Sequence, residues 1–296
     1  MGIDRAHYHG WEGKLRWPLL GCVALVRVAL VQVFRRKSYW FVIALCLVQF
    51  LFFFAAIYAI TQATVPVQTQ QNILRTFGFS AEGPSGEESG YTRFMGRQSL
   101  VVMILLAFSG SLLVGSDFRN KSLPFYLSRR IDRRHYILGK LLAVSVLVSL
   151  LTTLPAVVLY VEFGLFTGSI DYWLNDWRSL VAVLVYGLVL CVTLSIMLVT
   201  LSAYLQRMAP IAITWCSLFL LLRRLASYLA NETGYPAWLL LDPWHDIHAA
   251  GQLCFARHAV SVEPQLGWWS LAILASVCTL CLAALVHRVR AVDIVQ

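Results

Sequence analysis

The stretch from Gly115 to Lys140 concentrates the groups in this chain that could make charge-based contacts. It reads GSDFRNKSLPFYLSRRIDRRHYILGK and holds seven Lys or Arg against two Asp. Guanidinium and ammonium groups at this density bind carboxylates, phosphates or anionic lipid headgroups. Apolar residues alternate with the charges and predict a short amphipathic helix, with Asp117 near its positive N-terminal end. The stretch therefore predicts a charged contact surface.

Two interpretations of this surface stay open on charge alone. In the first, its apolar side chains press into a groove on a cytoplasmic protein while the basic residues fix the orientation. In the second, the arginines from Arg129 to Arg134 only hold a membrane boundary against anionic lipid, at about 1 kcal/mol each. The apolar members of the surface are Phe118, Leu123, Phe125, Tyr126 and Leu127.

Three further ionisable residues lie within or near the ends of apolar runs. Arg223 and Arg224 interrupt one run about 21 Å from its start. In one interpretation they extend to the outer headgroups or pair with Glu162, Asp242 or Asp246; in the other they face a cavity between two copies and meet an anionic substrate. Glu162 near the end of another run could belong to a proton or substrate path, or lie at an interface where a carboxylate is tolerated.

Metal, nucleotide and enzymatic chemistry lack the residue sets that they need. His245 and His248 flank Asp246 at a helical spacing, but a metal site needs further ligands at fitting positions. Gly139-Lys140 has neither the upstream Gly nor the following Ser or Thr of a phosphate-binding loop. No nucleophile–base pair or paired carboxylates are evident. The sequence predicts no metal site, no cofactor and no catalytic centre in this chain, so any ATP and Mg²⁺ would belong to another subunit.

Apolar helices must position these residues. The chain is 59% hydrophobic and 13% charged, with a mean hydropathy of +0.69. A soluble domain of this size would carry roughly twice that charged fraction. The net charge is +9, but the basic residues collect at the ends of apolar runs, which argues for membrane lipid rather than nucleic acid as the partner. The composition predicts an all-α polytopic membrane protein.

Six runs are apolar enough to cross a bilayer, which needs about 20 residues. The second run is short and is expected to include Phe94–Ser99, and Pro155 is expected to kink the third. The predicted spans are Trp40–Ile60, Leu100–Val114, Leu141–Val161, Leu180–Leu201, Ala209–Leu229 and Trp268–Val286.

The basic residues predict that both termini are cytoplasmic. In that orientation 17 Lys and Arg lie on the inner side and seven on the outer side, while five acidic residues lie inside and ten outside. This asymmetry follows the rule that basic loops stay in the cytoplasm. The predicted external segments are 61–98, a flexible loop containing AEGPSGEESG, and 230–267, with short helices at the outer interface.

The run Leu19–Phe34 precedes the first span and ends in Arg35-Arg36-Lys37. At 16 residues, with Arg27 inside it, the run is short for a span. We interpret it as a helix on the cytoplasmic interface. The alternative, a seventh span, places the N-terminus outside and conflicts with the charge asymmetry. The chain is thus divided into an arm and interfacial helix (1–38) and one membrane domain (39–296).

The basic stretch resembles the first cytoplasmic loop of ABC-2 type transporter permeases, also called type V exporters. Those families often show an acidic residue at the inner end of the second span, a Gly-Thr, a Leu-Ser-Arg-Pro-Ile-x-Arg run, and Gly-Lys opening the third span. Two positions depart from that pattern, since Lys121-Ser122 stands in the Gly-Thr place and Arg130 replaces the proline. The matching residues are Asp117, Leu127-Ser128-Arg129, Ile131, Arg133 and Gly139-Lys140.

The resemblance implies a permease subunit of an ATP-binding cassette exporter in the inner membrane of a prokaryote. It implies two permease copies or paralogues, and a cytoplasmic ATPase docked on loop 116–140, which acts as a coupling helix. A second hypothesis is a non-transporting anchor that passes ATP-driven motion to an external or periplasmic protein. The residues expected to couple the ATPase are Asp117, Phe118, Leu123, Tyr126, Leu127, Arg129, Arg133 and Lys140.

Overall fold

The fold was analysed in a computed structural model that describes residues 18–63, 66–80, 83–84, 89–115, 117, 133–168, 170–255 and 264–291. Apart from one pair of two-residue strands, the elements in these ranges are helical. Six helical segments are long and apolar enough to cross a membrane, which confirms the predicted number. They are Lys37–Gln62, Gly90–Gly115, Arg133–Thr167, Trp177–Leu205, Met208–Thr233 and Gln265–Val289.

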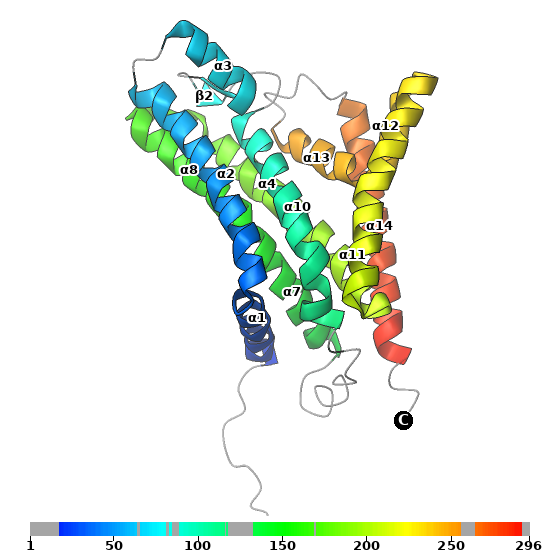
Figure 1. The fold of residues 1–296 in the computed structure, drawn as a ribbon. Coiled ribbons are helices and arrows are strands. Elements are labelled where there is room, and N and C mark those ends of the chain that lie inside the picture. Colours follow the sequence, from blue (N-terminus) through cyan, green and yellow to red (C-terminus); the bar gives the residue numbers. More distant parts are fainter. Residues whose placement is uncertain are drawn as a thin grey trace, which may run out of the picture.

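The long helices run side by side between two ends of the molecule (Figure 1). We name these ends after the helices found there, the α1 end and the α3 end. The first half of the chain contributes α1 (Pro18–Phe34), α2 (Lys37–Gln62), α3 (Val67–Phe77), β1 (Phe79–Ser80), β2 (Gly83–Pro84), α4 (Gly90–Gly110), the π-helical segment η1 (Ser111–Gly115), α7 (Arg133–Leu151) and α8 (Thr153–Thr167).

The second half continues the bundle and adds short helices at the α3 end. Its elements are α9 (Ile170–Asn175), α10 (Trp177–Leu205), α11 (Met208–Cys216), the π-helical segment η2 (Ser217–Leu221), α12 (Leu222–Thr233), the 3₁₀ helix η3 (Pro236–Leu241), α13 (Pro243–Cys254) and α14 (Pro264–Ala291).

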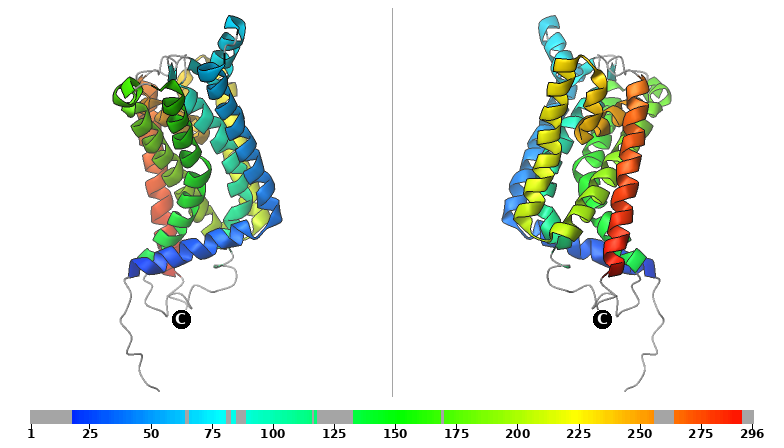
Figure 2. Two further views of the ribbon diagram at one scale, coloured as in Figure 1. Left: turned by 90° about the vertical axis from the view of Figure 1, so that its left-hand side faces the viewer. Right: turned by 90° about the vertical axis from the view of Figure 1, so that its right-hand side faces the viewer.

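Helix α1 lies across the end of the bundle, at a steep angle to the other helices (Figure 2). It packs on α7, where a Cβ atom added at Gly139 would lie 2.8 Å from Leu25 Cδ1. At the corner with α2, Trp40 Nε1 donates a hydrogen bond to the Phe34 carbonyl at 2.9 Å. Val23 remains 62% exposed. The predicted helix Leu19–Phe34 is therefore present nearly to the residue, while its position at a membrane interface stays a prediction.

The third span is broken near Pro155, as predicted. Helix α7 ends at Leu151 and α8 begins at Thr153. Pro155 has no N–H, so the Leu151 carbonyl has no helical donor four residues on. The buried Gln98 amide replaces that donor, since its Nε2 donates to the Leu151 carbonyl at 2.9 Å and to the Cys46 carbonyl at 3.1 Å. One side chain of α4 thus joins α2 and α7 at the break.

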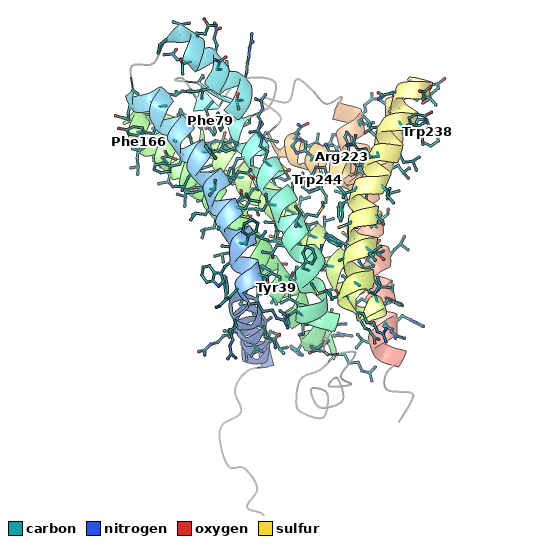
Figure 3. All side chains as sticks on the ribbon, viewed as in Figure 1. Tyr39, Phe79, Phe166, Arg223, Trp238 and Trp244 are labelled. Atoms are coloured by element: carbon teal, nitrogen blue, oxygen red, sulfur yellow. The ribbon has the colours of Figure 1, made fainter. Side chains whose placement is uncertain are left out.

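The predicted start of the second span is wrong by several residues. The helix begins at Gly90, so residues 90–98 of the expected flexible loop are helical, and α3 with the strand pair fills much of the rest. Aromatic packing explains the difference. Phe79, Tyr91 and Phe94 are fully buried, and the Phe79 ring lies 5.2 Å from the Tyr91 ring. This cluster fixes the first turns of α4 at the α3 end, where Phe79 is labelled in Figure 3.

Three of the spanning segments are little covered by the rest of the described chain. The buried share of the most apolar stretch is 22% in Lys37–Gln62 and 17% in each of the segments Met208–Thr233 and Gln265–Val289. Between the last two spans, η3 and α13 form the short helices predicted for segment 230–267. They pack beside α12 and α14 at the α3 end (Figure 1).

Candidate functional site at the α1 end

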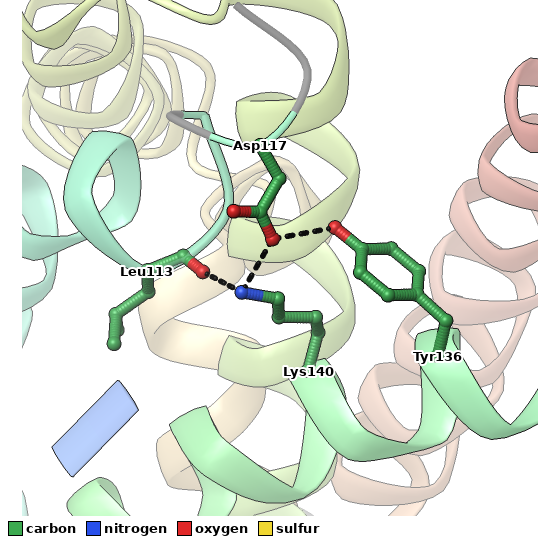
Figure 4. A network of polar contacts seen from close by, with 4 residues as sticks. All are labelled: Leu113, Asp117, Tyr136 and Lys140. Atoms are coloured by element: carbon green, nitrogen blue, oxygen red, sulfur yellow. Dashed lines mark hydrogen bonds and ion pairs between the residues drawn. The ribbon is translucent and has the colours of Figure 1, made fainter. Parts of the chain in front are cut away.

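A buried ion pair joins the second and third spans at the α1 end. Lys140 Nζ lies 2.7 Å from Asp117 Oδ2. The same ammonium donates to the Leu113 carbonyl at 2.6 Å, and Tyr136 Oη donates to Asp117 Oδ2 at 2.9 Å (Figure 4). We call Leu113, Asp117, Tyr136 and Lys140 the Asp117 network.

Two helices position this network. Tyr136 and Lys140 lie four residues apart on α7 and so share one face of that helix. Leu113 belongs to the π-helical segment that ends the second span, where the regular α-helical hydrogen bonding is interrupted. The Leu113 carbonyl accepts a charged donor there. The network therefore holds the last turn of one span against the first turns of the next.

A glycine brings a third helix close to this point. A Cβ atom at Gly115 would lie 2.8 Å from the Gln206 carbonyl oxygen, which ends α10. Gln206 itself adopts a left-handed φ of 57°. Because the contact is with backbone atoms, no side chain at position 115 is accommodated without a shift of the chain. The α1 end is closely packed around the network.

The pair is matched in charge and nearly withdrawn from water. The side chains of Lys140 and Asp117 are 8% and 12% exposed. Burying two charges is expensive unless they are paired and their remaining hydrogen-bonding capacity is used. Here the extra contacts to Leu113 and Tyr136 meet that condition. The pair also brings together the two ends of the stretch 116–140, so a force on that stretch acts on both spans.

The structure brings together two of the predicted coupling residues, Asp117 and Lys140. Arg133 is exposed at the first position of α7, about two turns before Lys140. The remaining predicted coupling residues lie outside the described part of the chain. They are Phe118, Leu123, Tyr126, Leu127 and Arg129.

Sequence reasoning missed Tyr136 and Leu113. The signal for Tyr136 was its place one helical turn before Lys140 on the same face. The Leu113 contact had no sequence signal, because it depends on a π turn. The structure also explains why glycine and lysine stand together at positions 139 and 140. Gly139 leaves room for the close approach of α1, and Lys140 forms the ion pair with Asp117.

The other predicted charges lie away from this network. Arg223 lines a cavity at the α3 end, and its charge acts on Asp242, one of the partners considered for it. Arg224, the next residue of α12, is exposed. Glu162 is 5% exposed, and neither of its carboxylate oxygens has a hydrogen-bond partner among the described residues. An unpaired buried carboxylate is costly, so Glu162 stays a candidate for a pathway.

His248 of α13 takes part in hydrogen bonds, whereas the distance from His245 to Asp246 is too long for one. His248 Nδ1 lies 3.1 Å from Tyr186 Oη, and His248 Nε2 lies 3.2 Å from Gln252 Nε2. His245 Nδ1 lies 3.8 Å from Asp246 Oδ1. Within the described ranges, no three His, Cys, Asp or Glu residues are grouped as a metal site requires.

Comparison with known proteins adds no family to these observations. No protein-family model matches the chain, and no curated protein matches it. The resemblance of the stretch 116–140 to ABC-2 permeases therefore stays a prediction that depends on the residues quoted for it.

Proposed function

We propose that the chain is the membrane-spanning permease subunit of an ATP-binding cassette exporter. In this proposal a separate cytoplasmic ATPase binds loop 116–140, and a second permease copy or paralogue completes the transporter in a prokaryotic cell membrane. The α1 end faces the cytoplasm, and α1 lies on the inner interface. The α3 end faces outward.

The Asp117 network is the observation that supports this proposal most directly. A coupling loop must pass the motion of its partner directly to the spans, so both ends of the loop must be held firmly to them. The ion pair joins residues at the loop's two ends, with 2.7 Å between Lys140 Nζ and Asp117 Oδ2, and the Lys140 contact to Leu113 includes the end of the second span. A pull on the loop would therefore tilt α4 and α7 together. Such a movement shifts a packed assembly between two arrangements.

One observation favours transport over the alternative of a non-transporting anchor. The α3 end contains a cavity lined by Arg93, Arg97 and Arg223. A protein that only passes motion to an external partner needs no polar binding volume beside its helices. A transporter needs one.

Isolation of the native complex tests the proposal. The protein is purified from its own membrane in lipid nanodiscs, its stoichiometric partners are identified by mass spectrometry, and ATP hydrolysis is measured. We expect an ATPase subunit at one copy per permease. The Leu127→Asp variant should insert into the membrane normally and copurify with little or none of the ATPase subunit.

A matched variant at the other end is the control. Leu174→Asp introduces the same charge on α9, where Leu174 is 67% exposed at the α3 end. This variant should keep the ATPase. Recovery of the intact protein without any ATPase, or equal loss of partner from both variants, would overturn the proposal.

A further inference from the structure

A cavity of about 660 Å³ opens at the α3 end between α3, α4, α12 and the short helices η3 and α13. Its volume is in the range of small-molecule sites. Arg223 and Trp244 lie on facing elements of this region (Figure 3). The residues that carry the inference are Arg75, Arg93, Arg97, Arg223, Asp242 and Trp244, all of which line the cavity.

Two of the four arginines are held in place by the end of α3. Arg93 and Arg97 are four residues apart on one face of α4. Arg93 Nη1 donates to the carbonyl of Arg75, and Arg97 Nη2 donates to the carbonyl of Thr76 at 3.0 Å. The Arg97 guanidinium has more N–H donors than this contact uses. Both groups are therefore held beside the cavity, and Arg97 keeps donors for a ligand.

The described residues of the cavity wall carry more positive than negative charge. Four of them are arginines, and one, Asp242, has a carboxylate. Asp242 is 3% exposed, and its Oδ1 accepts a hydrogen bond from the Trp244 N–H at 2.9 Å as the N-cap of α13. One carboxylate committed to a helix cap does not neutralise the exposed guanidinium groups of Arg75, Arg97 and Arg223. The remaining charge favours an anion with several oxygens, which planar guanidinium groups bind in pairs of hydrogen bonds.

Apolar side chains complete the wall. Leu100, Leu239 and Trp244 lie beside the arginines. Leu100 continues the face of α4 that carries Arg93 and Arg97, one turn further into the bundle. The wall thus changes from cationic to apolar over a short distance. A ligand that matches both parts carries an anionic head and an apolar body.

We propose that this cavity binds the phosphate group of an amphiphile, such as a phosphorylated lipid. The binding of such an amphiphile does not depend on the proposed function. Its assignment as the transported substrate rests on that function. A soluble phosphate ester offers the same anionic group without the apolar body. The test therefore separates the two sources.

The test measures lipid binding by the full chain in nanodiscs of phosphatidylcholine. Phosphatidic acid is added in steps, and native mass spectrometry counts the bound copies. A parallel titration replaces phosphatidic acid with inorganic pyrophosphate. We expect one tightly bound phosphatidic acid per chain and much weaker binding of pyrophosphate. Arg223→Gln and Arg97→Gln should each reduce the affinity about tenfold, as expected for loss of one charged hydrogen-bonding partner.

The neighbouring arginine is the matched control. Arg224→Gln removes the same charge from the adjacent position of α12, where the side chain is exposed and does not line the cavity. It should bind phosphatidic acid as the parent chain does. An equal loss of affinity in Arg223→Gln and Arg224→Gln would mean that phosphatidic acid binds to general surface charge, which would overturn the inference. Pyrophosphate binding as tight as that of phosphatidic acid would overturn the amphiphile assignment.

The ATPase measurement distinguishes this inference from the proposed function. Arg223→Gln should still bring down the ATPase subunit, because the cavity and the Asp117 network lie at opposite ends. Phosphatidic acid binding without any ATPase partner would keep the binding site and remove only its role as a transporter's substrate site.

Discussion

The two ends of the molecule handle charge in opposite ways. At the α1 end one lysine meets one carboxylate, and both are nearly buried. At the α3 end four arginines share an open cavity with one carboxylate, and three of them, Arg75, Arg97 and Arg223, are exposed. In the first arrangement the two opposite charges meet directly. Among the described residues of the second, positive charge exceeds negative charge.

This difference separates a mechanical role from a binding role. A buried pair whose hydrogen-bonding groups are occupied has little left to offer a ligand, but it resists separation because either charge alone would be buried without a partner. Guanidinium groups held on a cavity wall are in the reverse situation. The charge of the exposed Arg75, Arg97 and Arg223 attracts an anion, and the fixed position of Arg97 reduces the ordering that binding requires.

The largest expected effect comes from breaking the pair. Lys140→Met should destabilise the protein by about 3–5 kcal/mol, because Asp117 is left buried without its cation. Thermal unfolding in detergent measures the change. Adding Asp117→Asn should recover much of the loss, since no charge then stays unpaired. If the double variant were no more stable than Lys140→Met, the pair would not be a coupled unit. Arg224→Met, at an exposed site, should change stability by no more than about 0.5 kcal/mol.

A single methyl group added at each end sharpens the contrast between closed and open packing. In Gly115→Ala the new Cβ atom meets the Gln206 carbonyl oxygen at 2.8 Å, and backbone must move. We expect a loss of about 1–3 kcal/mol. In Gly96→Ala the Cβ atom meets His248 Cε1 at 3.0 Å, a contact with a side chain on the cavity wall and not with backbone. The same unfolding measurement should show a smaller loss there. A larger loss for Gly96→Ala would contradict the view that the α3 end is open.

The sequence predicted the number of spanning helices and part of one of the two sites. Long apolar runs predict the six spans, and Pro155 predicts the break in the third, because both signals are local. The Asp117 network was partly predictable for the same reason, since its helical residues lie close together in the chain. The shortened loop before α4 was not predictable, because it depends on aromatic rings that meet only in the folded state.

The arginine cavity shows most clearly which contacts could not be predicted from the sequence. Its charges come from α3, α4 and α12, and the last of these follows the others by more than a hundred residues. Periodicity indicates that Arg93 and Arg97 share a face of a helix, but it does not indicate that Arg223 lies opposite them. Arg223 and Arg224 also look equivalent in the sequence, and only the structure places one of them on the cavity wall.

The smallest expected effect is a pH dependence of lipid binding at the α3 end. Burial raises the pKa of Asp242 above its ordinary value, although Arg223 and His245 act in the opposite direction. As the pH falls through this raised pKa, the carboxyl becomes neutral and the net positive charge of the cavity grows. Anion affinity should therefore rise on acidification, by about fivefold for one unit charge at about 4 Å when water screens the interaction as in bulk solvent. The charged and titratable groups around Asp242 are Arg75, Arg93, Arg97, Arg223, His245 and His248.

Asp242→Asn isolates this contribution. Asparagine keeps the helix cap and removes the charge, so the variant should bind the anion tighter than the parent chain at pH 7.5. Phosphatidylglycerol is the suitable probe, because its phosphate diester keeps one negative charge across the titration. The variant should also lose part of the pH dependence. Weaker binding by Asp242→Asn would mean that Asp242 orders the arginines instead of opposing their charge, and the two ends of the molecule would then differ less than their charge balance indicates.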